Sequence, residues 1–113
     1  MQETSRKIGD KNETEATRFL EHEGFAIVER NYYASKLGEI DIIARKGSVL
    51  HFIEVKSAQS DFDPVHNITP AKLRKVINSA HYYMKSKKLD MAFCIDALLV
   101  RGGEVELIEN ITL

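Results

Sequence analysis

Three charged side chains interrupt two stretches of this sequence that are otherwise apolar and β-branched. Asp41 lies in "GEIDIIA", and Glu54 and Lys56 lie in "FIEVKS". Two carboxylates beside an ammonium group can hold a hard divalent cation such as Mg²⁺ and can move a proton next to it. A bound Mg²⁺ lowers the pKa of a water molecule and offsets charge on a phosphorane-like transition state. The pattern is therefore typical of phosphodiester hydrolysis.

The two stretches are predicted to form a β-hairpin, with strands at 37–45 and 49–57. Gly47 at the first position of a two-residue turn fits the type II′ geometry. That turn pairs Lys46 with Val49 and sets the register of the whole hairpin.

The register decides whether the charged side chains meet, because side chains alternate between the two faces of a strand. In the register set by the turn, Asp41 lies opposite Glu54. Glu39 then lies opposite Lys56, and we count Glu39 among the candidate catalytic residues. Two bare carboxylates about 4 Å apart repel by about 4 kcal/mol at an effective dielectric near 20, so a cation, a shared proton or Lys56 must compensate. The alternative is a solvated sheet face that carries ordinary salt bridges.

A helix is predicted over 12–24, with Asn12 as its N-cap and Gly24 after its end, unless it begins as early as Ser5. Glu13 lies at the edge of the apolar stripe of this helix. It is either directed inward or an acidic residue near the positive end of the helix.

A second helix is predicted over 69–88, with Thr69 as its N-cap. The stretch from Pro70 to Leu89 contains basic residues and no acidic ones; these are Lys72, Arg74, Lys75, Lys85, Lys87 and Lys88. The first turn of a helix disfavours a cation but welcomes a phosphate. We therefore predict that Lys72, Arg74 and Lys75 contact the phosphates of DNA. The alternative is a solvated helix face.

The remaining segments complete a mixed α/β fold. A strand is expected over 25–33, a long loop over 58–68 and a strand pair over 91–110, so helices should flank a central sheet. Cys94 is expected to be a buried core thiol. The four histidines are expected to be ordinary solvated side chains rather than ligands; these are His22, His51, His66 and His81.

Composition limits the class of protein. The 113 residues suit one domain over 1–113, with 43% hydrophobic and 29% charged residues. The net charge of −1 provides no global field for nucleic acid, so DNA must be bound by a local patch. There is one cysteine, no apolar leader segment and no apolar run of about 20 residues. We expect a cytoplasmic protein without membrane contact.

The spacing of Asp41, Glu54 and Lys56 resembles the core of the PD-(D/E)XK nuclease superfamily. The chain is most similar to the bacterial YraN-like family, which resembles archaeal Holliday junction resolvases. The likeness rests on "IGDKNETEATRFLEHEGFAIVERNYY", "GEIDIIA", "FIEVKS", "ITPAKLRKVINSAHYYM" and "FCIDALLV".

This resemblance implies a restriction-endonuclease-like fold and Mg²⁺ or Mn²⁺ held by Asp41, Glu54 and the main-chain carbonyl of Val55. It assigns Lys56 to the catalytic lysine position and Glu13 to the helix carboxylate near the site. It also implies action on DNA, including branched or structured DNA, by a homodimer.

Three functions remain open at this point. The first is a metal-dependent endonuclease acting on DNA, the second a catalytically silent nucleic-acid-binding module, and the third a protein-interaction subunit on the same fold. Together, Asp41, Glu54 and Lys56 favour the nuclease, because a binding module has little need of all three.

Overall fold

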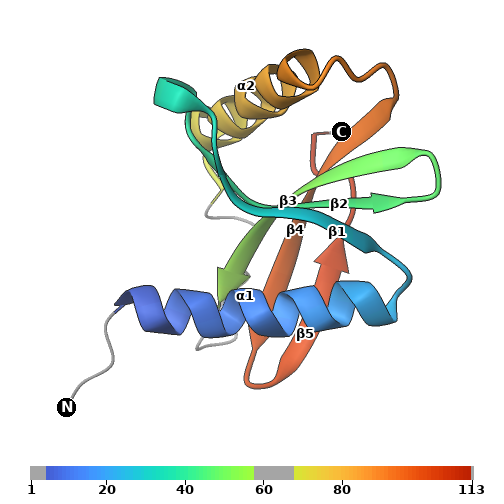
Figure 1. Ribbon diagram of the computed structural model, residues 1–113. Coiled ribbons are helices and arrows are strands. Elements are labelled where there is room, and N and C mark those ends of the chain that lie inside the picture. The colour runs from blue at the N-terminus through green and yellow to red at the C-terminus, as the bar shows by residue number, and fades with distance from the viewer. Residues whose placement is uncertain (1–4, 58–67, 113) are drawn as a thin grey trace.

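Five strands form one mixed sheet, and a helix packs on each of its faces (Figure 1). The computed structural model describes residues 5–57 and 68–112. In chain order the elements are α1 (Ser5–His22), β1 (Ala26–Tyr33), the short 3-10 helix η1 (Ser35–Leu37), β2 (Glu39–Lys46), β3 (Val49–Ser57), α2 (Pro70–Ser86), β4 (Ala92–Arg101) and β5 (Glu104–Ile108). This order confirms the predicted α/β class and is compatible with a restriction-endonuclease-like fold.

The strands lie in the order β1-β2-β3-β4-β5. Only β3 and β4 are parallel, since the chain between them passes through α2 on one face of the sheet; every other neighbouring pair is antiparallel. The two parallel strands lie in the middle of the sheet and are buried on both faces, which explains their long apolar runs.

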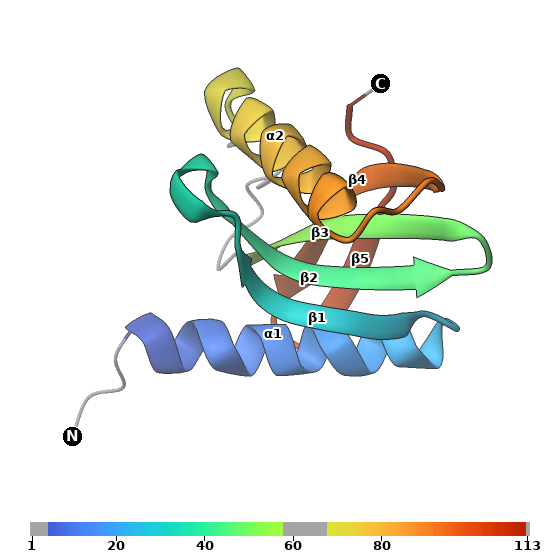
Figure 2. The same cartoon turned by 45° about the horizontal axis from the view of Figure 1, so that its top comes forward.

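The sheet separates two apolar clusters, and Figure 2 shows the two helices on opposite sides of it. On the α1 side the buried residues are Ala16, Leu20, Phe25, Ile42, Ala44, Ile53, Leu98 and Val100. On the α2 side they are Ile40, Ile43, Leu50, Phe52, Val76, Ala80, Tyr83, Met84 and Ile95. Neighbouring positions alternate between the clusters in β3, in β4 and from Ile42 to Ala44 in β2, so burial fixes the faces of these segments; Ile40 lies on the α2 side, as Ile43 does.

Helix α1 begins at Ser5, which confirms the alternative start, and the predicted N-cap at Asn12 is wrong. No proline stands between these residues, and a single asparagine does not stop a helix that has already begun. Glu13 therefore lies well inside the helix and not in its positively polarised first turn. Gly24 has φ of +94° after the helix end, as predicted.

Helix α2 begins as predicted. The side chain of Thr69 accepts a hydrogen bond from the main-chain N–H of Lys72 at 3.1 Å, and Pro70 occupies the first helical position. Neither of the described helices has the length and apolar character that crossing a lipid bilayer demands. The predicted loop over 58–68, with His66, lies outside the described residues except for Ile68.

Candidate active site

The β2–β3 hairpin has the predicted register. Gly47 has φ of +61° and the strand pairs run from Lys46–Val49 to Ile42–Ile53. The ladder ends there, and beyond it a carboxylate oxygen of Asp41 accepts the main-chain N–H of Val55 at 2.8 Å. Asp41 thus accepts a main-chain N–H that lies beyond the last pair of the ladder. This hydrogen bond holds the carboxylate between the two strand ends.

A pocket of about 390 Å³ opens between this end of the hairpin and the first turns of α2. Three acidic residues line it, Glu39, Asp41 and Glu54, together with three lysines, Lys56, Lys72 and Lys75, and with Gly38, Val55 and Val76. The structure confirms that Asp41, Glu54 and Lys56 meet in one place, as the register argument predicted. The pocket brings acidic and basic groups together from the β2–β3 hairpin and from α2.

Glu54 is the carboxylate whose ionisation is most disfavoured. It is only 5% exposed. Burial and the negative charge of Asp41 raise the pKa of Glu54 to about 8, against the opposing effect of Lys72 and Lys56. Its Oε1 atom is buried, and among the residues that the structure describes no group hydrogen-bonds to it. A buried oxygen without a partner is costly, so this position is suited to a bound cation or proton.

Asp41 and Glu39 experience weaker perturbations. Burial raises the pKa of Asp41, while the Val55 N–H and the lysines Lys56 and Lys72 act in the opposite direction. Glu39 is largely exposed and lines the pocket, and the partial burial of its carboxylate, followed by the charges of Asp41 and Glu13, raises its pKa.

The ammonium group of Lys56 loses its proton more readily than that of an ordinary lysine. Burial lowers the pKa of Lys56, and Lys72 lowers it further through a hydrogen bond and through its positive charge. A lysine with a lowered pKa is closer to the range in which an amine exchanges protons near neutral pH.

Two of the predicted site residues lie outside the pocket lining. Glu13 forms an ion pair with Arg30 on β1 at 3.6 Å, and its link to the site is its charge acting on Glu39. Arg74 is exposed on α2, whereas Lys72 and Lys75 on the same helix line the pocket.

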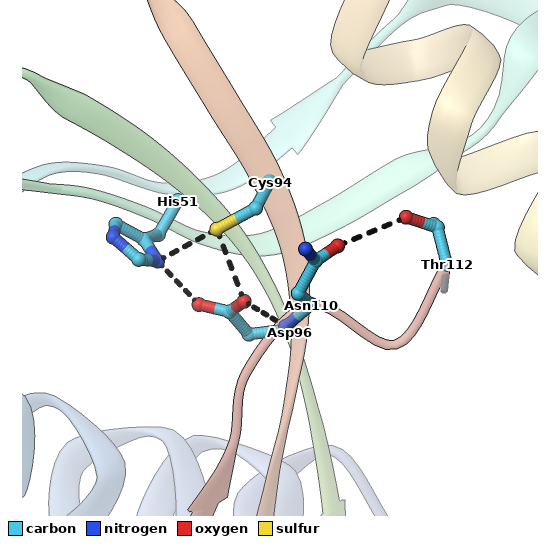
Figure 3. A network of polar contacts seen from close by, with 5 residues as sticks. All are labelled: His51, Cys94, Asp96, Asn110 and Thr112. Carbon is cyan, nitrogen blue, oxygen red and sulfur yellow. Dashed lines mark hydrogen bonds and ion pairs between the residues drawn. The ribbon is translucent and has the colours of Figure 1, made fainter.

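The sequence interpretation missed a second polar cluster, made by His51, Cys94 and Asp96 (Figure 3). The expectation that His51 is solvated is wrong, because it is only 6% exposed, whereas His22 and His81 are exposed as expected. Cys94 is partly exposed and contacts polar atoms, so it is not a simple core thiol. The available signal was an aspartate two positions after the only cysteine, within an apolar strand.

The pocket suits a hard divalent ion. Asp41 and Glu54 both line it and supply carboxylate oxygens, and the buried Oε1 of Glu54 has no hydrogen-bond partner among the described residues. Oxygen donors of this kind bind Mg²⁺ and Mn²⁺. Ligation by the Val55 carbonyl remains a prediction.

Comparisons with known proteins give one consistent result. The model of the uncharacterised protein family UPF0102 matches residues 12–100. The UPF0102 protein of Sulfurovum sp. is 69% identical over 113 residues, and the alignment covers 100% of both chains. Those of Wolinella succinogenes and Helicobacter hepaticus are 58% and 51% identical over 109 residues, which cover 96% of this chain and 99% and 97% of theirs.

Proposed function

We propose a function from the premise that this chain belongs to the UPF0102 family, which is part of the restriction-endonuclease-like superfamily. The proposal is a metal-dependent endonuclease that hydrolyses DNA phosphodiester bonds. The observation that supports it best is the buried, unpartnered Oε1 of Glu54, a residue that lines one pocket together with Asp41 and three lysines.

In this proposal Asp41 and Glu54 hold Mg²⁺ or Mn²⁺, with the Val55 carbonyl as a third donor. When bound, the ion lowers the pKa of a water molecule and offsets negative charge at phosphorus. The hydrogen bond from the Val55 N–H keeps Asp41 oriented before any ion arrives.

Lys56 either accepts a proton from the attacking water or orients that water. Its lowered pKa favours a role as proton acceptor. While it is charged, Lys56 can instead contact a phosphate oxygen. Either role requires a position beside the two carboxylates, and all three residues line the same pocket.

Lys72 and Lys75 supply the local positive charge that a chain of net charge −1 needs for binding DNA. The N-terminus of α2 adds main-chain N–H groups and the positive end of the helix dipole. We further propose that the substrate is branched or structured DNA. Two copies of the chain would then act on its two strands.

A cleavage assay tests the proposal. Purified protein is incubated with duplex, flap and four-way junction DNA in Mg²⁺, Mn²⁺ or a chelator. Cleavage should require the divalent ion and disappear in Asp41→Asn and Glu54→Gln, whereas Glu104→Gln, at an exposed position on β5, should behave as wild type. DNA binding without cleavage by any of these proteins would favour the binding module instead.

A melting experiment tests the metal separately. An ion that binds only the native state raises the melting temperature with occupancy. Mn²⁺ should raise it in wild type and in Glu104→Gln and should have little effect in Asp41→Asn. Equal shifts in wild type and Asp41→Asn would show that the ion binds elsewhere.

A further inference from the structure

Three potential metal ligands converge on the face of the sheet that α1 covers. In the parallel register of β3 and β4, His51 lies directly beside Cys94, and Asp96 follows on the same face of β4. Nδ1 of His51 lies 2.5 Å from Oδ2 of Asp96 and 3.1 Å from Sγ of Cys94, and Sγ lies 3.3 Å from Oδ1 of Asp96 (Figure 3). Two neighbouring strands thus point a nitrogen, a sulfur and a carboxylate at one another.

The surrounding residues hold two of the three groups in place. Asp96 is completely buried, and its Oδ1 accepts the main-chain N–H of Asn110 at 2.9 Å. The ring of Phe25 packs edge-on against His51, with the ring centres 4.9 Å apart. Donors oriented before an ion arrives lose little freedom when they bind it.

When Asp96 is ionised, the three groups carry fewer hydrogens than they make short contacts. The thiol and Nδ1 carry at most one hydrogen each, and an ionised Asp96 carries none. If both hydrogens are directed at Asp96, the 3.1 Å contact between nitrogen and sulfur has no hydrogen of its own. A cation shared by all three groups would explain why they converge.

We propose that His51, Cys94 and Asp96 form a binding site for a divalent ion of the Zn²⁺ class. Thiolate, imidazole and carboxylate are the donors that zinc takes in tetrahedral sites. Zinc bonds of about 2.0–2.3 Å place tetrahedral donors about 3.3–3.6 Å apart, so the three atoms must separate slightly when the ion enters. The thiolate makes this site selective against Mg²⁺, which prefers oxygen donors.

The ion has a route into this site and space for a fourth ligand. His51 and Cys94 line a pocket of about 440 Å³ together with Lys46, Glu109 and Asn110. The exposed Glu109 offers a carboxylate at its edge, and water is the alternative fourth ligand. The Nζ of Lys46 lies 5.0 Å from the centre of the Phe25 ring. Binding replaces the thiol proton of Cys94 and leaves the imidazole proton on Nε2.

Cobalt and zinc test the proposal on the full-length protein in a phosphine reductant. One equivalent of Co²⁺ should produce a thiolate-to-cobalt charge-transfer band in wild type and none in Cys94→Ala, because Cys94 is the only cysteine. At a free Zn²⁺ concentration of about ten times Kd, alkylation of Cys94 should slow roughly tenfold, since only the unbound fraction reacts. Zn²⁺ should also raise the melting temperature of wild type but not of Cys94→Ala.

The controls separate this site from the carboxylate pocket. Glu54→Gln should keep the cobalt band and the protection from alkylation, and Cys94→Ala should keep any melting shift caused by Mn²⁺. Absence of the cobalt band, or an alkylation rate unaffected by Zn²⁺, would overturn the proposal. A band lost in Glu54→Gln as well would place the ion in the carboxylate pocket and overturn it too.

Discussion

Strand β3 carries two polar sites that face opposite sides of the sheet, and they differ in how well their buried groups are satisfied. On the α2 side, Glu54 is buried beside Asp41 and has an oxygen that no described residue hydrogen-bonds. On the α1 side, Asp96 is equally buried, but His51, Cys94 and the Asn110 N–H all contact its carboxylate. The carboxylate of Glu54 has an oxygen without a partner and lines a pocket, whereas that of Asp96 ties β3, β4 and the segment after β5 together.

This difference shows that burial of a carboxylate does not by itself indicate its role. A buried acid with three partners stabilises the fold, and its loss leaves donors without acceptors. A buried carboxylate with an unsatisfied oxygen destabilises the fold until a cation or a proton binds to it. The two sites should therefore respond to substitution with opposite signs.

Asp96→Ala should produce the largest effect on stability. It removes the acceptor of His51 Nδ1 and of the main-chain N–H of Asn110, at about 1–3 kcal/mol each, so the free energy of unfolding should fall by about 2–6 kcal/mol. Urea unfolding measures this change. Glu104→Ala, at an exposed position, should stay within about 0.5 kcal/mol of wild type. If the free energy of unfolding falls no further in Asp96→Ala than in Glu104→Ala, the contacts of Asp96 do not stabilise the fold.

Lys56→Met should produce the largest effect on the proposed reaction. Removing a proton-transfer group costs about a hundredfold or more in rate, while the methionine retains much of the apolar stem. Single-turnover cleavage of the best DNA substrate with Mn²⁺ measures it. Folding should be preserved, because Lys56 is partly exposed and its ammonium group is destabilised by burial and by Lys72. Cleavage within a few-fold of wild type would exclude Lys56 from the chemistry.

The sequence allowed the carboxylate pocket to be predicted because a local turn determines it. Gly47 at a two-residue turn fixed the hairpin register, and alternation then placed Asp41 and Glu54 together. The two helices and the strand order along the chain also followed from caps, glycines and apolar periodicity. The short helix Ser35–Leu37 was not predicted, and the start of α1 at Ser5 was only the alternative to a start at Asn12, since neither has a strong local signal.

The second cluster could not be predicted in the same way. The side chains of Cys94 and Asp96 share a face of one strand, which the sequence shows, but their neighbour His51 lies on a strand joined to theirs through α2. No turn sets the register of such a parallel pair, so local chemistry does not place His51 beside Cys94. Glu13 illustrates a different limit, because its ion pair with Arg30 depends on how α1 lies across β1.

Glu54→Gln should stabilise the metal-free protein at pH 8. The pKa of Glu54 is about 8 in the folded chain, well above its ordinary value of 4.5. Below pH 4.5 both states are protonated, and as the pH rises from there to 8 the unfolded state ionises first, so stability is lost through this window. Glutamine does not titrate, so the variant should be more stable at pH 8 by on the order of a few kcal/mol, and its melting temperature should be higher by several degrees or more.

Thermal unfolding from pH 4.5 to 8.5 in a chelator measures this effect. The melting temperatures of wild type and Glu54→Gln should converge toward the acidic end of the range. Glu104→Gln should follow wild type throughout, because its side chain is exposed. A wild-type protein that gains stability relative to Glu54→Gln as the pH rises would show that the carboxylate is satisfied, like Asp96.

The smallest expected effect concerns the basic wall of the carboxylate pocket. In the proposed function, Lys72 and Lys75 contact DNA phosphates because both line the pocket, whereas Arg74 on the same helix does not. Each lost phosphate contact lowers the slope of log K against log salt by about one, so Lys72→Ala with Lys75→Ala should lower it by about two. Arg74→Ala should lower it less, and Lys85→Ala, in the last turn of α2, should leave it unchanged.

Fluorescence anisotropy at several salt concentrations measures the slopes on two unrelated DNA sequences. Because phosphate contacts position DNA without reading its bases, the affinity loss should be the same for both sequences. An equal change in slope for Arg74→Ala and Lys72→Ala would mean that the whole exposed helix, and not the pocket wall, attracts the DNA.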